Sequence, residues 1–352
     1  MASVLIVVGN YNGARLLPQC LPSLQSQTFP DCSVLVVDNC SPDDSVAVAR
    51  SHGVDVLPMP INGGLGPAYN AGAAASDSDY IFFMNNDMRL DPRCIEELVR
   101  VLETHPDAFA ADPLQWSWDG APLLHAKTIL RPGRWFGEIV PGFNLSYTPD
   151  AGSLAPVCWG CAGSLLVRRS MFEQLSGFDH TFFLNFEDVD LCWRAWRSGW
   201  TTWYVPSARL WHRLGSSQGA AVATQAAEPR GRKRPSPLAL RVLRSGEKNR
   251  LRFVLKVMDR PYIARYVASL VVRWAGHLLA GRATDAGGIV RAVVGCLAEG
   301  TDIWRERRRL SARSTLDNAE LYALWGDLGC LTPRGRDTSR GARPVAATQE
   351  NR

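Results

Sequence analysis

The sequence predicts a doubly wound α/β fold with a mostly parallel sheet, and three observations support this prediction. Short apolar runs rich in Val, Ile and Leu, as in strands covered on both faces, occupy residues 3–8, 33–37, 54–57, 80–84 and 108–111. Amphipathic segments that suit the covering helices alternate with them, at residues 16–27, 43–50, 67–76 and 92–103. Polar clusters follow three of the strands, at residues 9–13, 38–41 and 85–87. Sheets of this kind bind ligands beyond the carboxyl ends of their strands, so we expect a site there.

The composition is that of a globular protein with a hydrophobic core. Hydrophobic residues make up 46% and charged residues 21% of the 352 residues, a balance that excludes a disordered chain. No basic segment precedes the first apolar run, which ends at Gly9, so we interpret this run as a buried strand and not as a signal peptide. We therefore expect a cytoplasmic chain whose nine cysteines are reduced thiols.

The pattern changes after residue 112. Residues 112–156 are irregular, and a second structured stretch follows at residues 157–212. Residues 216–245 are rich in Ser, Gly, Ala, Pro, Arg and Lys, which predicts a basic flexible linker after a first domain of residues 1–215.

A helical extension is predicted over residues 246–332. Its apolar residues recur along one helix face, at Ile263, Val267, Leu270, Val271, Trp274 and Leu278. The uninterrupted apolar length is too short to span a bilayer. The polar tail of residues 333–352 is predicted to be disordered.

The net charge of +5 hides a strong asymmetry. Residues 1–215 contain 14 Lys and Arg against 22 Asp and Glu, a balance of −8. Residues 230–260 contain 11 basic and 2 acidic residues, a balance of +9. An acidic front half joined to a basic segment indicates two surfaces with different tasks.

Carboxylates and one histidine form a candidate metal site. Asp87 follows a buried strand, Glu187 and Asp188 begin a helix, and His212 follows another strand. Mg²⁺ and Mn²⁺ take oxygen ligands and keep positions open for phosphates, so this set can bind an ion and still leave one carboxylate as a base. Taken singly, the acidic pair is explained equally well as a complement to a helix N-terminus, and His212 as a surface histidine beside a tryptophan.

The segment NGGLGPAYNAG at residues 62–72 predicts an anion-binding turn. Glycines at a helix start let backbone N–H groups approach a phosphate, and the helix dipole favours the negative charge. The glycine motif of nicotinamide-dependent oxidoreductases would follow the first strand directly, whereas this turn follows the third, which disfavours that class.

Four motifs, in this order, resemble glycosyltransferase family 2, the inverting enzymes with the GT-A fold, and in particular its rhamnosyltransferase-like branch. They are VGNYNG at 8–13, VDNCS at 37–41, the 62–72 turn together with NND at 85–87, and GFD at 177–179 running into FEDVD at 186–190. The resemblance covers residues 1 to about 215. It implies a Rossmann-like domain of GT-A type, with the helices that follow as a C-terminal extension.

The resemblance also implies roles for residues at the strand ends. Asp38 would hold the base or ribose of a nucleotide-diphosphate sugar by charge-assisted hydrogen bonds. The same pocket would be lined by Asn10, Asn62, Gly64, Asn70, Asn85 and Asn86. The segment NND occupies the place of the family's metal-binding D-x-D motif, so the contact to Mg²⁺ or Mn²⁺ passes to Asp87. His212 matches a histidine that completes the metal and diphosphate site.

The implied mechanism is a single inverting displacement. A metal neutralises the leaving diphosphate, and Asp188, supported by Glu187, takes the proton from the acceptor hydroxyl as it attacks the anomeric carbon. The acceptor would contact the irregular stretch, where three aromatic rings are candidates for stacking on sugars: Trp116, Trp118 and Trp135. Trp159 is expected in the core.

The sequence leaves the partners of the extension open. Acceptors in this family are often lipid-linked, so the basic helices suit an anionic membrane surface, with the enzyme peripheral on its inner face. The alternative is that the helices pack on the catalytic domain and their charges are solvated. Nucleic acid is not expected, because no recognition motif accompanies the charge.

Within the family, two donors are considered. Deoxythymidine-diphosphate rhamnose is the first hypothesis, from the branch resemblance, and a uridine-diphosphate hexose is the second. The acceptor would be a glycan or a lipid-linked sugar. The rival from another class is a non-catalytic nucleotide-sugar-binding protein of the same fold, and the intact Asp87, Asp188 and His212 argue against it.

Overall fold

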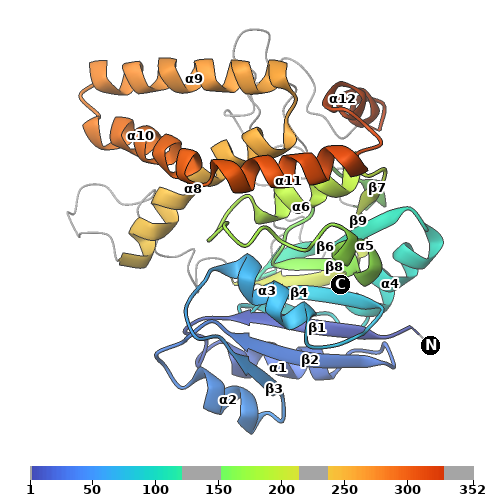
Figure 1. Ribbon diagram of the computed structural model, residues 1–352. Helices are drawn as coiled ribbons and strands as arrows, with labels where there is room; N and C mark the ends of the chain where they lie inside the picture. Colours follow the sequence, from blue (N-terminus) through green and yellow to red (C-terminus); the bar gives the residue numbers. More distant parts are fainter. Residues whose placement is uncertain (1, 121–151, 214–236, 329–352) are drawn as a thin grey trace, which may run out of the picture.

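A computed structural model describes residues 2–120, 152–213 and 237–328 of the chain (Figure 1). Its strands are β1 Val4–Asn10, β2 Cys32–Asp38, β3 Asp55–Pro58, β4 Tyr80–Asn85, β5 Met88–Leu90, β6 Ala108–Ser117, β7 Ala155–Pro156, β8 Ser164–Arg168 and β9 Thr201–His212. The helices among and after them are α1 Leu17–Gln25, α2 Ser45–Ser51, α3 Leu65–Ala73, α4 Cys94–Thr104, α5 Arg169–Gln174, α6 Glu187–Arg197, α8 Pro237–Val257, α9 Arg260–Leu279, α10 Ala283–Ala298, α11 Gly300–Arg313 and α12 Asn318–Asp327.

The strands form one sheet in the order β3-β2-β1-β4-β8-β6-β9-β5, with β7 paired to β9. The first four strands of this order are parallel, as predicted, and β6 is parallel to β9. The strand β8 runs antiparallel to both β4 and β6, and β5 runs antiparallel to β9. The fold is therefore the α/β class expected, with a parallel half that continues into a mixed half.

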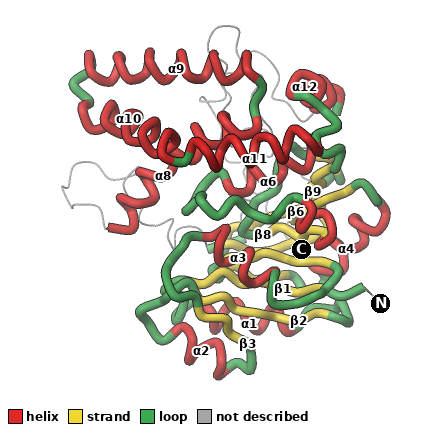
Figure 2. The backbone as a smooth tube through the Cα atoms, in the orientation of Figure 1, coloured by secondary structure: helices red, strands yellow, loops and turns green. Residues whose placement is uncertain are grey.

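Helices cover both faces of this sheet (Figure 2). Alternate residues of β1 point to opposite faces, as the two-residue period of a strand requires. Val4, Ile6 and Val8 pack with α1, α2 and α4, whereas Leu5 and Val7 pack with α3, α5 and α6. The core on the second face continues without a break into the C-terminal helices.

The linker predicted at residues 216–245 is shorter than expected. Helix α8 begins at Pro237, so residues 237–245 are helical. Proline is favourable in the first helical turn, and the residues that follow it are mostly good helix formers, a preference that the Pro- and Arg-rich composition obscured. Residues 216–236 and the tail at 333–352 lie outside the described residues.

Buried ion pairs join the extension to the first domain. Lys256 Nζ lies 2.6 Å from Asp179 Oδ2 and 2.7 Å from Asp190 Oδ1. Arg252 Nε lies 3.0 Å from Asp179 Oδ2, and the Arg252 side chain has no exposed surface. Arg252 also reaches α11 and its N-cap, through Asp302 at 2.6 Å and Glu299 at 3.2 Å. Two basic residues of the segment with balance +9 are therefore neither solvated nor turned toward a partner.

Charge pairing controls the ionisation of Asp179. Burial alone would raise its pKa, but the adjacent Lys256 and Arg252 outweigh burial and hold the pKa well below the usual range. A carboxyl group with a lowered folded-state pKa stabilises the fold above the pKa of an unfolded aspartate, about 3.9. This contribution is lost as the pH falls toward the folded-state value.

A second contact is aromatic. Trp325 of α12 is fully buried and meets Trp193 and Trp196 of α6 edge to face, with centroids 4.8 and 5.9 Å apart. The Trp193 indole also donates a 2.9 Å hydrogen bond to Asn318 Oδ1. The extension is thus packed on the first domain at both ends. Among the described residues, no helix combines the length and apolar character needed to cross a bilayer.

We expect Arg252→Met to lower the free energy of unfolding by about 3–5 kcal/mol, because it leaves Asp179 and its acidic neighbours short of a buried countercharge. Urea denaturation followed by circular dichroism measures this. The control is Arg309→Met, which removes a surface pair with Glu306 from a side chain that is 62% exposed. The control should change stability by less than about 0.5 kcal/mol. Equal stability of the two variants would contradict a structural role for the buried pairs.

Candidate active site

Three buried polar side chains meet where β1, β2 and β4 end. The Asn10 amide donates to Asp38 Oδ1 at 2.7 Å, and the Asn86 amide donates to Asn10 Oδ1 at 2.7 Å. The register of the strands places Asn10 opposite Asp38, so the parallel pairing itself brings them together. A Cβ atom on Gly13 would overlap the Asn10 and Asn86 side chains, which is why this position of the first motif requires glycine. Asn10 and Asn86 therefore link the ends of β1, β2 and β4 by buried hydrogen bonds.

Asp38 shapes the turn after β2. Its carboxylate is buried and accepts hydrogen bonds from the Ser41 backbone N–H at 2.9 Å and the Ser41 hydroxyl at 2.6 Å, besides the one from Asn10. The buried charge is thus well solvated by protein groups.

The glycine turn before α3 is held by Asn39, which the sequence analysis did not single out. Asn39 donates to the Gly64 carbonyl at 2.9 Å and accepts from the Gly63 N–H at 3.1 Å. Asn62 Oδ1 accepts from the Gly64 N–H at 3.2 Å. Gly64 has a φ of +98°, and a Cβ there would overlap the Phe183 carbonyl. The turn is therefore fitted against the loop that precedes α6.

Asn70 has a different task from the one predicted. Its amide donates to the Phe178 carbonyl at 2.8 Å, and its Oδ1 accepts from the Phe178 N–H at 2.9 Å. Both polar atoms are engaged by one backbone unit of the GFD motif. Asn70 thus ties α3 to this motif and is a positioning residue, because its hydrogen bonds are directed into the protein and not into a pocket.

The Tyr69 hydroxyl is influenced by several acidic residues of the site. It donates to Asn85 Oδ1 at 3.1 Å. Burial is the main cause that raises its pKa. Smaller contributions come from four groups that can carry negative charge: Cys161, Glu187, Asp87 and Asp188. The carboxylate after β4 and the pair at the start of α6 therefore all act electrostatically on the same hydroxyl.

Glu187 and Asp188 are neighbours with different surroundings. Asp188 is partly exposed and accepts hydrogen bonds from the backbone N–H groups of Val189 at 2.8 Å and Ala162 at 3.4 Å. Glu187 is buried, and its Oε2 has no hydrogen-bond partner among the described residues. Burial, followed by the charge of Asp188, raises the pKa of Glu187 above the usual range. At neutral pH the pair can therefore hold a protonated Glu187 beside an ionised Asp188.

A chain of hydrogen bonds fixes the orientation of His212. The Ser164 hydroxyl donates to Asp112 Oδ1 at 3.3 Å and accepts from the Gln115 amide nitrogen at 2.8 Å. The Gln115 oxygen therefore faces His212 Nδ1 at 3.2 Å, and this nitrogen is the donor. In the neutral imidazole the lone pair is then on Nε2, which lies 3.3 Å from Asp87 Oδ1.

Asp87 and His212 could supply part of the ligand set of a divalent cation. An imidazole lone pair beside a carboxylate is a set of donor atoms that attracts a cation, and the Gln115 amide supplies the outer contact that orients metal-binding histidines. Across residues 2–120, 152–213 and 237–328, no group of three or more His, Cys, Asp or Glu side chains is arranged to hold a metal. Asp87 and His212 can therefore supply two ligands, and water or a diphosphate would supply the others.

Helix α8 positions the loop before α6, which the sequence analysis missed. The Asn249 amide is buried and donates to the carbonyls of Leu184 and Asn185, at 3.0 and 2.9 Å. Asn185 and Phe186 have φ angles of +72° and +73°, a left-handed conformation that is unfavourable for a residue as bulky as phenylalanine. Asn249 thus helps to hold a strained segment that leads directly into Glu187.

Arg241 extends this contact to the glycine turn. Its guanidinium lies 3.8 Å from the centre of the Phe183 ring and donates to the Asn62 carbonyl at 2.9 Å. The sequence around Arg241 gave no indication of this contact, because the two residues of the hydrogen bond are 179 positions apart in the chain.

The candidate acceptor-side tryptophans differ in their surroundings. Trp159 is buried, as expected of a core residue. Trp116 and Trp118 are partly exposed, and the guanidinium groups of Arg89 and Arg213 lie 4.7 and 4.8 Å from the centre of the Trp118 ring. Trp135 lies outside the described residues.

Comparisons with known proteins agree with the sequence motifs. The model of the family "Glycosyl transferase family 2" matches residues 5–175. N-acetylglucosaminyl-diphospho-decaprenol L-rhamnosyltransferase of Mycobacterium tuberculosis (strain H37Rv) is 34% identical over 242 residues, which cover 62% of this chain and 79% of that protein. The chain belongs to glycosyltransferase family 2.

Other similarities of this glycosyltransferase are more limited. Rhamnosyltransferase WbbL of Escherichia coli (strain K12) is 32% identical over 143 residues, covering 39% of this chain and 53% of that protein. The crystal structure of GalNAc-T7 with UDP, GalNAc and Mn²⁺ shares the fold, with a TM-score of 0.51 at 16% identity, over 74% of this chain and 49% of that one.

We expect Asn249→Ala to lower kcat of this glycosyltransferase about tenfold or more, since a displacement of about 1 Å near reacting groups can cost 10²-fold. Affinity for the donor, measured by calorimetry, should stay within about twofold of wild type. Ser245→Ala, which removes a hydrogen bond made only within α8, is the matched control. If kcat and thermal stability fall together, and Ser245→Ala does the same, Asn249 acts on folding and not on the loop.

Proposed function

We propose that this glycosyltransferase inverts the anomeric carbon of a nucleotide-diphosphate sugar, with Asp188 as the general base that accepts the proton of an acceptor hydroxyl. The observation that carries the proposal is the split environment of the two adjacent carboxyl groups. A base must be ionised and within reach of the acceptor, and Asp188 is the partly exposed member, with two backbone N–H groups that favour its charge. The N-terminus of α6 adds to this preference.

Glu187 is assigned a supporting role. Its raised pKa favours the protonated form, which adds no second negative charge beside Asp188. It also fills the buried side of the helix start.

The donor is assigned to the loops after β1, β2 and β3. Asp38 and its turn suit the base or ribose, and the start of α3 suits the diphosphate, because the helix dipole favours negative charge there. Asn85 lies on the same side, next to Tyr69. Two of the relatives are named as rhamnosyltransferases, which supports deoxythymidine-diphosphate rhamnose as the donor, with a uridine-diphosphate hexose as the second candidate.

Asp87 and His212 are assigned to Mg²⁺ or Mn²⁺. When bound, such an ion would neutralise negative charge on the leaving diphosphate. The chain of hydrogen bonds from Asp112 through Ser164 and Gln115 would keep the His212 lone pair directed at the ion.

The acceptor is assigned to the lipid-linked class, with a free glycan as the alternative. Support comes from the mycobacterial relative, whose name gives a diphospho-decaprenol acceptor. Such an acceptor lies at a membrane, and the exposed apolar side chains of α9 and α10 suit a peripheral position on an anionic membrane face. A chain cut near residue 215 would not test this position, because it also removes the countercharges of Asp179 and Asp190.

Asp188→Asn should lower transfer from deoxythymidine-diphosphate rhamnose to a lipid-linked N-acetylglucosamine acceptor by about 10²–10⁴-fold, since it removes the proton acceptor but keeps the shape. Donor affinity should be retained. Glu187→Gln is the control, because the amide mimics the protonated acid, and we expect a loss of less than about tenfold. A greater loss in Glu187→Gln than in Asp188→Asn would reverse the two assignments.

Gln115→Leu should weaken Mn²⁺ binding by about 10–100-fold, because the His212 ring loses the contact that orients it. Titration of Mn²⁺ followed by electron paramagnetic resonance measures this without turnover. His212→Ala provides the lower limit of affinity. Unchanged Mn²⁺ binding in both variants would exclude His212 as a ligand.

A further inference from the structure

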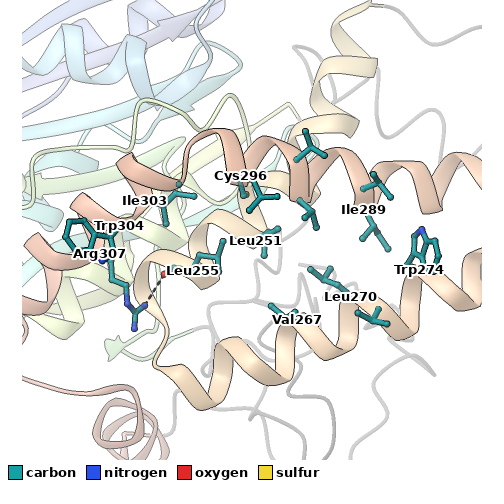
Figure 3. A pocket seen from close by; sticks show the side chains of 16 residues that line it. Leu251, Leu255, Val267, Leu270, Trp274, Ile289, Cys296, Ile303, Trp304 and Arg307 are labelled. Atoms are coloured by element: carbon teal, nitrogen blue, oxygen red, sulfur yellow. Dashed lines mark hydrogen bonds between the residues drawn. The ribbon is translucent and has the colours of Figure 1, made fainter.

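Helices α8 to α11 enclose an apolar groove on the extension (Figure 3). Its volume is about 650 Å³, within the range of about 300–1,000 Å³ usual for ligand sites. Labelled side chains of these helices line it, with Leu270 of α9 and Ile289 of α10 on facing helices and Trp304 of α11 and Trp274 of α9 toward its two ends. The only charged side chain of the lining is Arg307, which donates to the Leu255 carbonyl at the end of α8.

The walls of the groove are open to solvent to an unusual degree. Val271 of α9 is 61% exposed, and Val294 of α10 is 59% exposed. Leu297 and Trp304 are exposed beside them. A contiguous apolar surface of this kind in a protein marks a site for a ligand or partner.

The groove lies directly behind the catalytic loop. Helix α8 turns Asn249 and Arg252 toward the loop before α6 and the GFD motif. The same helix turns Leu251 and Leu255 into the groove. A single helix, about 10 Å across, therefore separates the groove from the segment that carries Asp188.

Two arginines stand beside the lining of the groove. Arg308 lies over the ring of Trp304 at 4.6 Å, and exposed Arg291 follows Val290 of the lining. An apolar groove with cationic side chains beside it complements a hydrocarbon chain that ends in phosphate groups.

We propose that this groove binds the polyisoprenoid chain of the acceptor lipid, an inference that rests on the lipid-linked acceptor of the proposed function. A hydrocarbon chain makes no hydrogen bonds and needs walls without unpaired polar groups, which this lining provides. The diphosphate end then lies toward the arginines beside the groove. A flat bilayer surface would instead touch the outermost side chains, such as Leu279, which is 90% exposed and lies outside the groove.

The test is binding of fluorescently labelled geranylgeranyl diphosphate to the full chain, in solution and without vesicles. We expect saturable binding that Val271→Glu weakens by about tenfold or more, because a carboxylate is costly among hydrocarbon groups. Val294→Glu on the facing helix should act alike. Leu279→Glu, which adds the same charge to α9 outside the groove, should stay within about twofold of wild type.

Three outcomes would overturn the inference. The first is the absence of saturable binding, and the second is an equal loss of isoprenoid affinity in Val271→Glu and Leu279→Glu. The third is that Leu279→Glu loses association with anionic vesicles while the groove variants bind the isoprenoid as wild type does. The last result would assign the surface to a bilayer. Because this assay needs no turnover, its failure is distinct from failure of the proposed function, which is decided by Asp188→Asn and by transfer to a short water-soluble acceptor.

Discussion

Two basic side chains of α8 neutralise carboxylates of the catalytic domain almost without contact with solvent: Lys256 pairs with both Asp179 and Asp190, and Arg252 pairs with Asp179. Both carboxylates belong to motifs of the catalytic domain, GFD and FEDVD. A carboxylate buried without a countercharge costs several kcal/mol, so Asp179, whose ion pairs in the described residues are with α8, depends on this helix. Asp190 also pairs with Arg194 of its own helix, at 2.8 Å. The extension is therefore part of the active-site architecture, although its described residues, 246–328, contribute no strand to the sheet.

The same helix accounts for how Asp188 is held. The loop before it contains two non-glycine residues in left-handed conformations, Asn185 and Phe186, each of which costs about 1–3 kcal/mol. Asn249 bonds the loop carbonyls, and Phe186 is buried against Phe253 of α8 with ring centroids 5.9 Å apart. Contacts with one helix thus offset the strain and direct the start of α6 toward Tyr69 and Asp87. The strain sits next to the proposed base, where a fixed position has the greatest effect on rate.

The sequence predicted the parallel half of the sheet well, because its strands are formed by apolar runs that are local features of the sequence. The predicted strands match β1 to β4 to within two residues at each end, since apolar runs and the turns that end them are encoded locally. Motif order predicted that Asp87, Glu187, Asp188 and His212 form one site. The structure brings His212 to 3.3 Å from Asp87, and the joint site of the four stays a prediction. The roles of Asn70, Asn249 and Arg241 could not be predicted, because an amide or guanidinium binds whatever the distant chain brings to it. The charge imbalance was misinterpreted for the same reason: −8 and +9 suggested separate surfaces, whereas part of the imbalance is pairing between them.

Helix α8 therefore has two faces with three tasks, and this limits how variants of it can be interpreted. Arg252 and Lys256 neutralise the catalytic domain, Asn249 holds the loop, and Leu251 and Leu255 line the groove. Residues only two positions apart on one rigid helix cannot move independently, so a substitution that shifts α8 acts on the loop and on the groove together. Substitutions on the facing helices α9 and α10 avoid this coupling, because they alter the groove without touching any group that contacts the loop. The effects of Val271 and Asn249 variants on the rate of transfer should then add, as free energies, in a double mutant. A departure from additivity would measure how strongly a hydrocarbon chain in the groove acts on the reacting residues through α8.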